Sequence, residues 1–141
     1  MNKFLIPVLL TFSCLFACQA EIPAPGGELA GLYHTWTLVG IETDNKWEDV
    51  PSDLNDMTLA LDAELRASLS TDCNQGGGTY TVDPDGSIDF NAGALTNVYC
   101  GEFGDKWERL FLISLEAVDQ FSLADDELWL WNDDLSLRFE R

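Results

Sequence analysis

Short stretches in which apolar and polar residues alternate run through most of the chain after residue 35, and they limit its fold more than any other feature. The stretch Met-Thr-Leu-Ala-Leu at residues 57–61 is one example. Because successive side chains of a strand point to opposite faces, such alternation predicts β-strands that are buried on one face. The expected strands are residues 35–42, 57–61, 65–69, 79–82, 87–90, 120–123, 127–131 and 135–139.

The connections between these strands predict antiparallel hairpins. Residues 83–86, Asp-Pro-Asp-Gly, contain the proline and glycine that suit a tight turn. A short connection at 62–64 joins the second and third strands, and residues 132–134 separate the last two strands of a C-terminal meander. We therefore expect an antiparallel sheet.

One segment, from Gly104 to about Asp119, follows the period of a helix instead. Its apolar residues recur three and four positions apart and fall on one face; they are Trp107, Leu110, Phe111, Leu115 and Val118. Asp105 and Arg109 lie four residues apart, in the order that favours a surface ion pair. Because the apolar face of this helix must be covered, we predict an α+β fold that is mainly antiparallel β.

The predicted architecture is a curved sheet or partly open β-barrel, with this amphipathic helix packed on it or plugging it. We expect its interior to be filled by large aromatic side chains. The candidates are Trp36, Tyr80, Trp107, Phe111, Trp129 and Trp131.

The chain begins with the features of an export signal. Lys3 precedes an uncharged apolar run from Phe4 to Ala17, which is shorter than a membrane-spanning helix. The tetrad Leu-Phe-Ala-Cys that ends at Cys18 resembles the lipobox of bacterial lipoproteins, whose cysteine receives a diacylglyceryl group before cleavage. We interpret residues 1–17 as a lipoprotein signal peptide; the alternative is an ordinary signal peptide that happens to contain a cysteine.

A flexible tether is expected after the lipidated cysteine. Residues 18–32 contain prolines and glycines without apolar periodicity. Two or more acyl chains on Cys18 would hold the protein to a bilayer stably and replace a spanning helix. The resemblance to lipoproteins also favours the outer membrane, because Gln19 stands where an aspartate tends to cause retention in the inner membrane. We therefore expect a cell-envelope protein that is anchored to the bacterial outer membrane and faces the periplasm.

The acidic composition excludes one class of partner. The chain has 25 Asp and Glu against 7 Lys and Arg, a formal net charge of −18. Nucleic-acid binding depends on Lys and Arg that neutralise phosphates, so nucleic acid is not expected as a partner. The acidic residues are scattered, which indicates solubility; the alternative is a specific cationic partner. We expect the protein to be a monomer.

After removal of the signal, two cysteines remain besides the lipidated Cys18: Cys73 and Cys100. An even pair in an exported protein is most simply interpreted as a disulfide, which would stabilise the domain by about 3 to 4 kcal/mol. The alternative, a metal site, needs further ligands, and the one histidine, His34, is distant in sequence. We expect no metal.

The residues around Cys73 carry a family resemblance. Residues 73–80, Cys-Asn-Gln-Gly-Gly-Gly-Thr-Tyr, resemble the G-C-N-x-x-x-G-x-Y signature of the META domain, also called the HslJ-like domain. The segment from Thr96 to Cys100 is similar to the T-x-M-x-C segment of this family, and the segment from Trp36 to Leu38 to its opening W-x-L. The helix also matches an E-x-x-F-L-x-x-L-x-x-V pattern of the family, starting at Glu108.

The resemblance covers residues 33–141, and three departures lie in or next to its motifs. Asp72 replaces the usual glycine, Gly76 replaces an aromatic or bulky residue, and Val98 replaces methionine. The family implies a partly open β-barrel with one helix. It also implies a small envelope or secreted lipoprotein, associated with stress or antibiotic tolerance and without established common catalytic residues.

The residues that match the family motifs are expected to be structural: Trp36, Asn74, Gly78, Tyr80 and Thr96. Asn74 could bond its own backbone in the turn after Cys73. Gly78 could supply a positive φ or a close backbone approach. Tyr80 is expected to point inward.

No catalytic site is expected. The glycines at 76–78 lack the Lys and Ser/Thr of a phosphate-binding loop. Asp83, Asp85 and Asp89 could suggest a calcium loop, but a hairpin turn explains them equally and the full pattern of an EF-hand is absent. The sequence contains no motif of an activated serine for which His34 could act as the general base.

Two functions remain. In the first, the protein is a non-enzymatic, lipid-anchored envelope protein without a cofactor. It would act in stress tolerance or in the assembly of envelope proteins through a protein partner, as pilot lipoproteins of similar shape do. In the second, the barrel interior binds a small apolar ligand such as an acyl chain.

Overall fold

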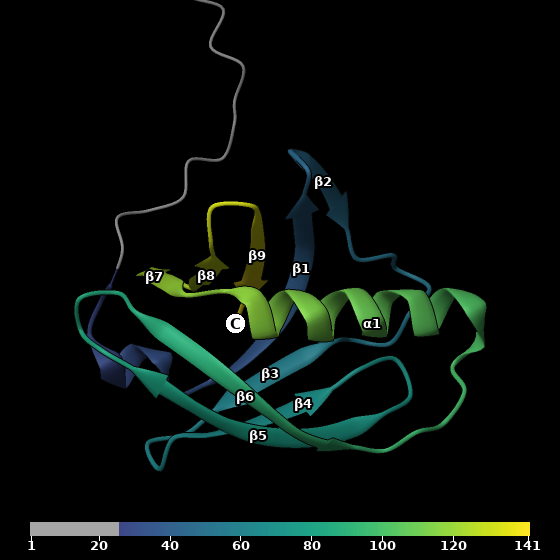
Figure 1. Cartoon of the computed structure of the whole chain (residues 1–141), viewed down its shortest axis with the longest axis horizontal. Coiled ribbons are helices and arrows are strands. Elements are labelled where there is room, and N and C mark those ends of the chain that lie inside the picture. Colours follow the sequence, from purple (N-terminus) through teal and green to yellow (C-terminus); the bar gives the residue numbers. More distant parts are fainter. Residues whose placement is uncertain (1–25) are drawn as a thin grey trace, which may run out of the picture.

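A computed structural model describes residues 26–141 of the chain. These residues form one curled antiparallel sheet with a single α-helix, α1 (Gly101–Ala117), packed on it (Figure 1). The prediction of an α+β, mainly antiparallel fold is confirmed. The expected signal peptide at 1–17, the expected lipidation site Cys18 and most of the expected tether lie outside the described residues.

The sheet is a half-barrel built from hairpins. Eight of its strands follow the order β6-β5-β4-β3-β1-β9-β8-β7, and β2 pairs with β1 outside this path. The three predicted hairpin units are confirmed, because β3 pairs with β4, β5 with β6, and β7 and β9 with β8. The strands are β1 (Thr35–Thr43), β2 (Lys46–Asp49), β3 (Thr58–Leu61), β4 (Arg66–Ser70), β5 (Gln75–Val82), β6 (Ile88–Leu95), β7 (Gln120–Ala124), β8 (Glu127–Trp131) and β9 (Leu135–Glu140).

Three features of the sheet differ from the sequence prediction, and the first is that β6 continues to Leu95, past the expected end at residue 90. Strand β2 has no alternating pattern, and it forms because Asp44 and Asn45 both adopt positive φ, 52° and 59°, and turn the chain back onto β1. Strand β5 starts at Gln75, before the expected residue 79, because the glycines at 76–78 continue the strand. Glycines have no side chains that could reveal alternation, so the sequence pattern missed this half of the strand.

The edge strands β6 and β7 meet at only one end of the half-barrel. There the Phe121 amide donates to the Gly86 carbonyl (2.8 Å), and the Ile88 amide donates to the Asp119 carbonyl (3.1 Å). Away from this closed end the two edges separate, and α1 lies across the gap (Figure 1). The open end of the half-barrel is therefore covered by a helix.

Helix α1 buries the apolar face that its periodicity predicts, with Trp107, Phe111 and Leu115 at 2% exposure or less. The expected ion pair between Asp105 and Arg109 is wrong. Asp105 turns back instead, and its Oδ1 accepts a hydrogen bond from the Cys100 amide (2.9 Å), which has no partner within the helix. No helix among residues 26–141 is long and apolar enough to cross a membrane.

The interior of the half-barrel is filled by side chains of the chain itself. Trp36 and Phe111 are fully buried, and Tyr80 is 1% exposed. The expectation for Trp129 and Trp131 was wrong, because Leu128 and Leu130 occupy the inward positions of β8 and the tryptophans alternate to the outer face. Trp129 packs there against Trp47, with ring centroids 6.2 Å apart, and Trp47 covers Gly40, where a Cβ would clash.

The folded body begins earlier than residue 33, the boundary expected from sequence. Residues 26–32, which the sequence predicts to be part of the tether, pack on the sheet and include a short 3-10 helix, η1 (Leu29–Leu32). Leu32 is fully buried, and the Gly26 amide donates to the Phe121 carbonyl (2.8 Å). The apolar residues in this segment are too few to show a period, and for this reason the sequence did not reveal its packing.

Candidate functional site

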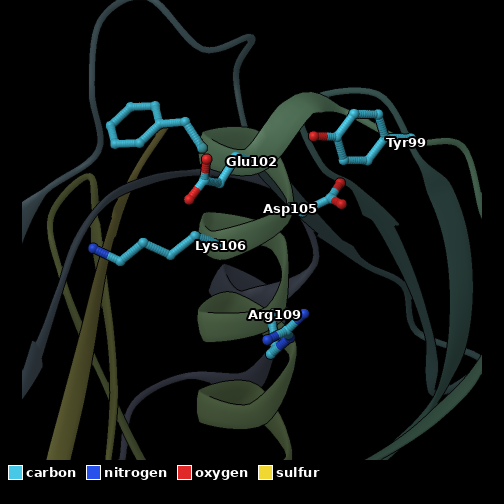
Figure 2. A pocket seen from close by; sticks show the side chains of 6 residues that line it. Tyr99, Glu102, Asp105, Lys106 and Arg109 are labelled. Carbon is cyan, nitrogen blue, oxygen red and sulfur yellow. The ribbon is translucent and has the colours of Figure 1, made fainter.

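Two adjoining cavities of about 690 and 510 Å³ lie on the outer side of α1, beside the loop that precedes it. They share Tyr99, Asp105 and Arg109, and together they are termed the α1 groove. Figure 2 shows part of its lining around the first turns of α1. The other lining residues are Asn97, Val98, Glu102, Phe103, Lys106, Glu108, Leu112 and Ile113.

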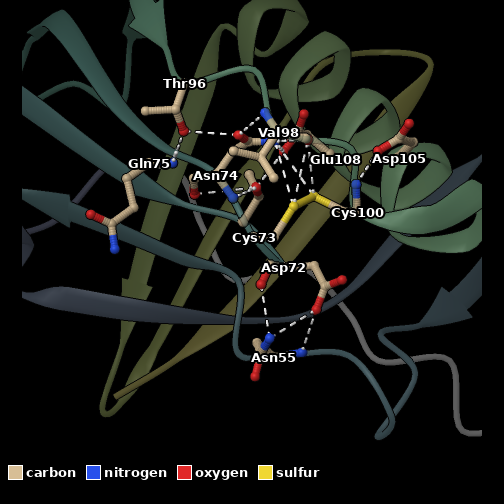
Figure 3. The surroundings of a disulfide bond; sticks show 11 residues. Asn55, Asp72, Cys73, Asn74, Gln75, Thr96, Val98, Cys100, Asp105 and Glu108 are labelled. Carbon is tan, nitrogen blue, oxygen red and sulfur yellow. Dashed lines mark hydrogen bonds between the residues drawn. A yellow bond between two sulfur atoms is a disulfide. The ribbon is translucent and has the colours of Figure 1, made fainter.

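A disulfide fixes the loop that borders the groove. The predicted bond between Cys73, in the turn after β4, and Cys100, directly before α1, is present (Figure 3). The two Cα atoms are 5.6 Å apart, and the cysteines are separated by 27 residues. The bond therefore joins the β4–β5 turn to the start of the helix.

The buried side chain of Asn74 adds four hydrogen bonds next to the disulfide (Figure 3). Its Oδ1 accepts from Thr96 Oγ1 (2.8 Å) and from the Val98 amide (2.7 Å). Its Nδ2 donates to the Val98 carbonyl (2.9 Å) and to Glu108 Oε2 (2.9 Å). The expectation that Asn74 bonds its own backbone was wrong, because its side chain holds the loop at 96–98 and α1 instead.

Glu108 of α1 is a member of this network to which the sequence analysis gave no role. Its carboxylate also accepts a hydrogen bond from the hydroxyl of Thr71. That hydroxyl in turn accepts a hydrogen bond from the backbone amide of Asn74 (3.2 Å). Both Thr71 and Asn74 are buried. A single carboxylate of the helix is therefore bound by two side chains of the β4–β5 turn.

The first turn of α1 packs directly on the disulfide. A Cβ at Gly104 would lie 2.7 Å from both Asp72 Oδ2 and the Cβ of Cys100, so only glycine fits there. Asp72, which departs from the glycine usual in the family, accepts a hydrogen bond from the Asn55 amide (2.9 Å). This hydrogen bond joins the segment before β3 to the β4–β5 turn, which carries Cys73.

The remaining motif residues lie in the sheet and not in the groove. A Cβ at Gly78 would clash with the backbone of β6, so this glycine permits a close approach of strands and has no positive φ. Trp36 Nε1 donates to the Leu32 carbonyl (2.9 Å). The hydroxyl of Tyr80 donates to the Asp62 carbonyl (2.7 Å), and burial raises the pKa of Tyr80 to about 12.

The aspartates of the β5–β6 turn are engaged in the turn itself. Asp85 Oδ1 accepts a hydrogen bond from the Ser87 amide (3.0 Å), and this bond lowers the pKa of Asp85. The Gly86 amide donates to the Asp83 carbonyl (3.1 Å). Within residues 26–141, no group of three or more His, Cys, Asp or Glu side chains is arranged to hold a metal ion.

The fold and the site together define a class of protein. It is a half-barrel in which one helix covers the gap between the edge strands, and a disulfide and a buried asparagine join that helix to the sheet. The chain belongs to the META domain family, whose family model matches residues 28–141. The match begins within the packed N-terminal segment, in agreement with an early start of the folded body.

Solved structures support the same fold. A protein from Burkholderia xenovorans, determined by NMR, superposes with a TM-score of 0.66 at 24% identity, covering 87% of this chain and 93% of that one. A DUF4847 family protein from Bacteroides vulgatus superposes with a TM-score of 0.56 at 14% identity, covering 77% and 92%. None of the curated proteins matches the chain. At these identities the likeness establishes the fold alone.

Proposed function

We propose that this META domain protein is a non-enzymatic, lipid-anchored protein of the bacterial envelope that acts through a protein partner. The observation that carries the proposal is the filled interior of the half-barrel. Trp36, Phe111 and Phe139 are fully buried inside it, in one continuous apolar cluster. A domain without an internal chamber interacts through its surface.

The filled interior also argues against the second candidate, an acyl chain bound inside the barrel. A cavity of about 230 Å³ lies between β6 and α1, lined in part by Gly93, Leu95 and Leu112. This volume is below the roughly 300 Å³ at which pockets for small molecules usually begin. Release of fatty acid from the denatured native protein, in equimolar amount by mass spectrometry, would restore this candidate.

The anchor is proposed from the lipobox-like tetrad that ends at Cys18. Two or more acyl chains at this residue would attach the folded body stably to the outer membrane, on the side of the periplasm. From the resemblance to the family and from this proposed location, we propose a role in stress tolerance or in the assembly of envelope proteins. Both parts of the proposal can be tested on the protein in its native host.

The test combines labelling with purification. Growth with radioactive palmitate should label the wild-type protein and not the Cys18→Ser variant, and the label should sediment with the outer membrane. Mild crosslinking of intact cells, followed by purification, should recover one envelope protein in stoichiometric amount. An unlabelled protein would contradict the anchor, and recovery of the protein alone would contradict the partner.

A further inference from the structure

The exposed apolar side chains of the described chain gather at one place. Five large apolar residues among residues 26–141 are exposed, and four of them line the α1 groove: Val98 (57%), Tyr99 (74%), Phe103 (46%) and Ile113 (60%). The fifth, Leu65 (40%), lies in the turn before β4. Clustered apolar groups with a polar rim are typical of surfaces that bind other proteins.

A cation without a partner lies within this cluster. Of the basic side chains in residues 26–141, Arg109 alone has no carboxylate of these same residues within 4.0 Å; the others, Lys46, Arg66, Lys106, Arg138 and Arg141, all form ion pairs. The finding is unexpected in a chain with 25 acidic residues and 7 basic ones. The guanidinium of Arg109 therefore presents its donors to the groove.

The acidic groups nearest to Arg109 in sequence are engaged elsewhere. Asp105 Oδ1 accepts from the Cys100 amide, and Glu108 accepts from Asn74 and Thr71. These hydrogen bonds, next to the disulfide, fix the positions of both carboxylates, so neither carboxylate pairs with Arg109. Figure 2 shows Tyr99, Asp105 and Arg109 on the same side of α1.

We propose that the α1 groove binds a segment of another envelope protein in which a carboxylate lies next to an aromatic or aliphatic side chain. The carboxylate would form a bidentate pair with Arg109, since guanidinium and carboxylate match in geometry. The apolar side chain would pack against Tyr99, which lines both cavities, and against either Phe103 or Ile113. This inference rests on the proposed function and names the surface and the partner chemistry.

Two other occupants fit the groove less well. A second copy of this chain carries the same net charge of −18, so that dimerisation is opposed by long-range repulsion. The N-terminal segment of the same chain enters the described body at Gly26, at the end of the molecule opposite to the loop before α1 (Figure 1).

The experiment uses the full-length protein in its native host, with a photo-crosslinking amino acid at position 103, 113 or, as the control, 65. Positions 103 and 113 should give an adduct with one envelope protein, while position 65, which is also exposed, should not. The crosslinked peptide, mapped by mass spectrometry, should contain Asp, Glu or a C-terminal carboxylate beside an apolar residue.

A charge reversal then tests the role of Arg109. Arg109→Glu should reduce the adduct at least about tenfold, because it removes the partner of the carboxylate and adds repulsion. Exchange of the mapped carboxylate for Arg in the partner should restore the adduct to Arg109→Glu. The matched control, Arg66→Glu, alters a cation that is paired with Asp62 and should leave the adduct unchanged. Melting temperatures near the wild-type value would establish that both variants fold.

Several outcomes would overturn the inference. Adducts with a second copy, with residues 18–25 or with lipid would identify a different occupant. Equal adducts from position 65, or an unchanged adduct in Arg109→Glu, would remove the groove as the specific site. If the partner co-purifies but positions 103 and 113 give no adduct, the groove is wrong and the proposed function stands. If no partner co-purifies at all, the proposed function itself fails.

Discussion

The two ends of the gap between β6 and β7 are held together in different ways. At the closed end the bonds are between backbone groups, from the Phe121 amide to the Gly86 carbonyl and from the Ile88 amide to the Asp119 carbonyl. At the open end the contacts are made by side chains: Asn74 bonds the backbone of Val98 and the Glu108 carboxylate, beside the disulfide. Every residue supplies backbone groups, whereas the open end needs particular side chains.

The difference explains why part of the family signature lies at the open end. Where two strands pair, many sequences can make the same ladder. At the open end, α1 covers the gap and no strand pairs with the loop at 96–98. The backbone groups of this loop therefore need hydrogen-bond partners other than a strand. Asn74 satisfies both backbone groups of Val98 at the open end, and Thr96 donates to Asn74 there, whereas the motif residues Trp36, Gly78 and Tyr80 lie in the sheet.

The largest effect is expected from Asn74→Ala. The change leaves the amide and carbonyl of Val98 without a partner and removes one of the two hydrogen bonds to the Glu108 carboxylate, and each such loss costs about 1 to 3 kcal/mol where the group is buried. We expect the free energy of unfolding in urea to fall by about 4 kcal/mol. Gln75→Ala is the control, because Gln75 is exposed and should cost less than about 0.5 kcal/mol.

Hydrogen exchange of the same variant makes the comparison sharper. The Val98 amide should exchange much faster in Asn74→Ala, whereas the Ile88 and Phe121 amides at the closed end should keep most of their protection. If all three amides lose protection equally, the two ends unfold as one unit. The distinction drawn between them would then be wrong.

Removal of the disulfide is expected to have the second-largest effect. The variant that carries both Cys73→Ser and Cys100→Ser should lose about 3 kcal/mol, because the unfolded chain is no longer closed into a loop. The hydrogen bonds of Asn74 to Val98 should remain, so the loop should stay more protected than in Asn74→Ala. Unfolding in urea, with and without reductant for the wild type, measures the loss. An unchanged midpoint on reduction would contradict it.

Much of the fold follows from local patterns, but the choice of the inward face does not. Alternation identified the strands of β8 and β9 correctly. In β8 both alternating sets are apolar, Leu128 and Leu130 on one face and Trp129 and Trp131 on the other. Strand β2 pairs with β1 and brings the side chain of Trp47 against Trp129 on the outer face, a contact that the pattern of β8 alone does not reveal.

The site shows the same limit. The two cysteines and Asn74 could be chosen from their motif, because these residues lie within one or two short segments. The bond from Asn74 to Glu108 joins residues 34 apart and depends on how α1 docks on the sheet. Arg109 is unpaired because the side chain of Asp105 accepts a hydrogen bond from the Cys100 amide. Helical spacing alone does not reveal this orientation of Asp105.

The smallest effect is expected at the closed end, where Tyr80 offers a test by pH. Burial raises the pKa of Tyr80 to about 12, above the usual value near 10. The native state therefore keeps this phenol neutral at a pH where the unfolded state ionises. Its contribution is fully present below about pH 10 and is lost as the pH rises from about 10 to 12.

The matched variant for this test is Tyr80→Phe. At pH 7 it should be less stable than the wild type by about 1 kcal/mol, because the hydrogen bond to the Asp62 carbonyl is lost. Between pH 10 and 12 the wild type should lose roughly 2 kcal/mol that the variant keeps, so the two curves should converge and cross. Unfolding in urea across this range measures both proteins. Parallel curves would show that Tyr80 ionises in the native state as readily as in the unfolded one, and that its environment is more hydrated than its burial implies.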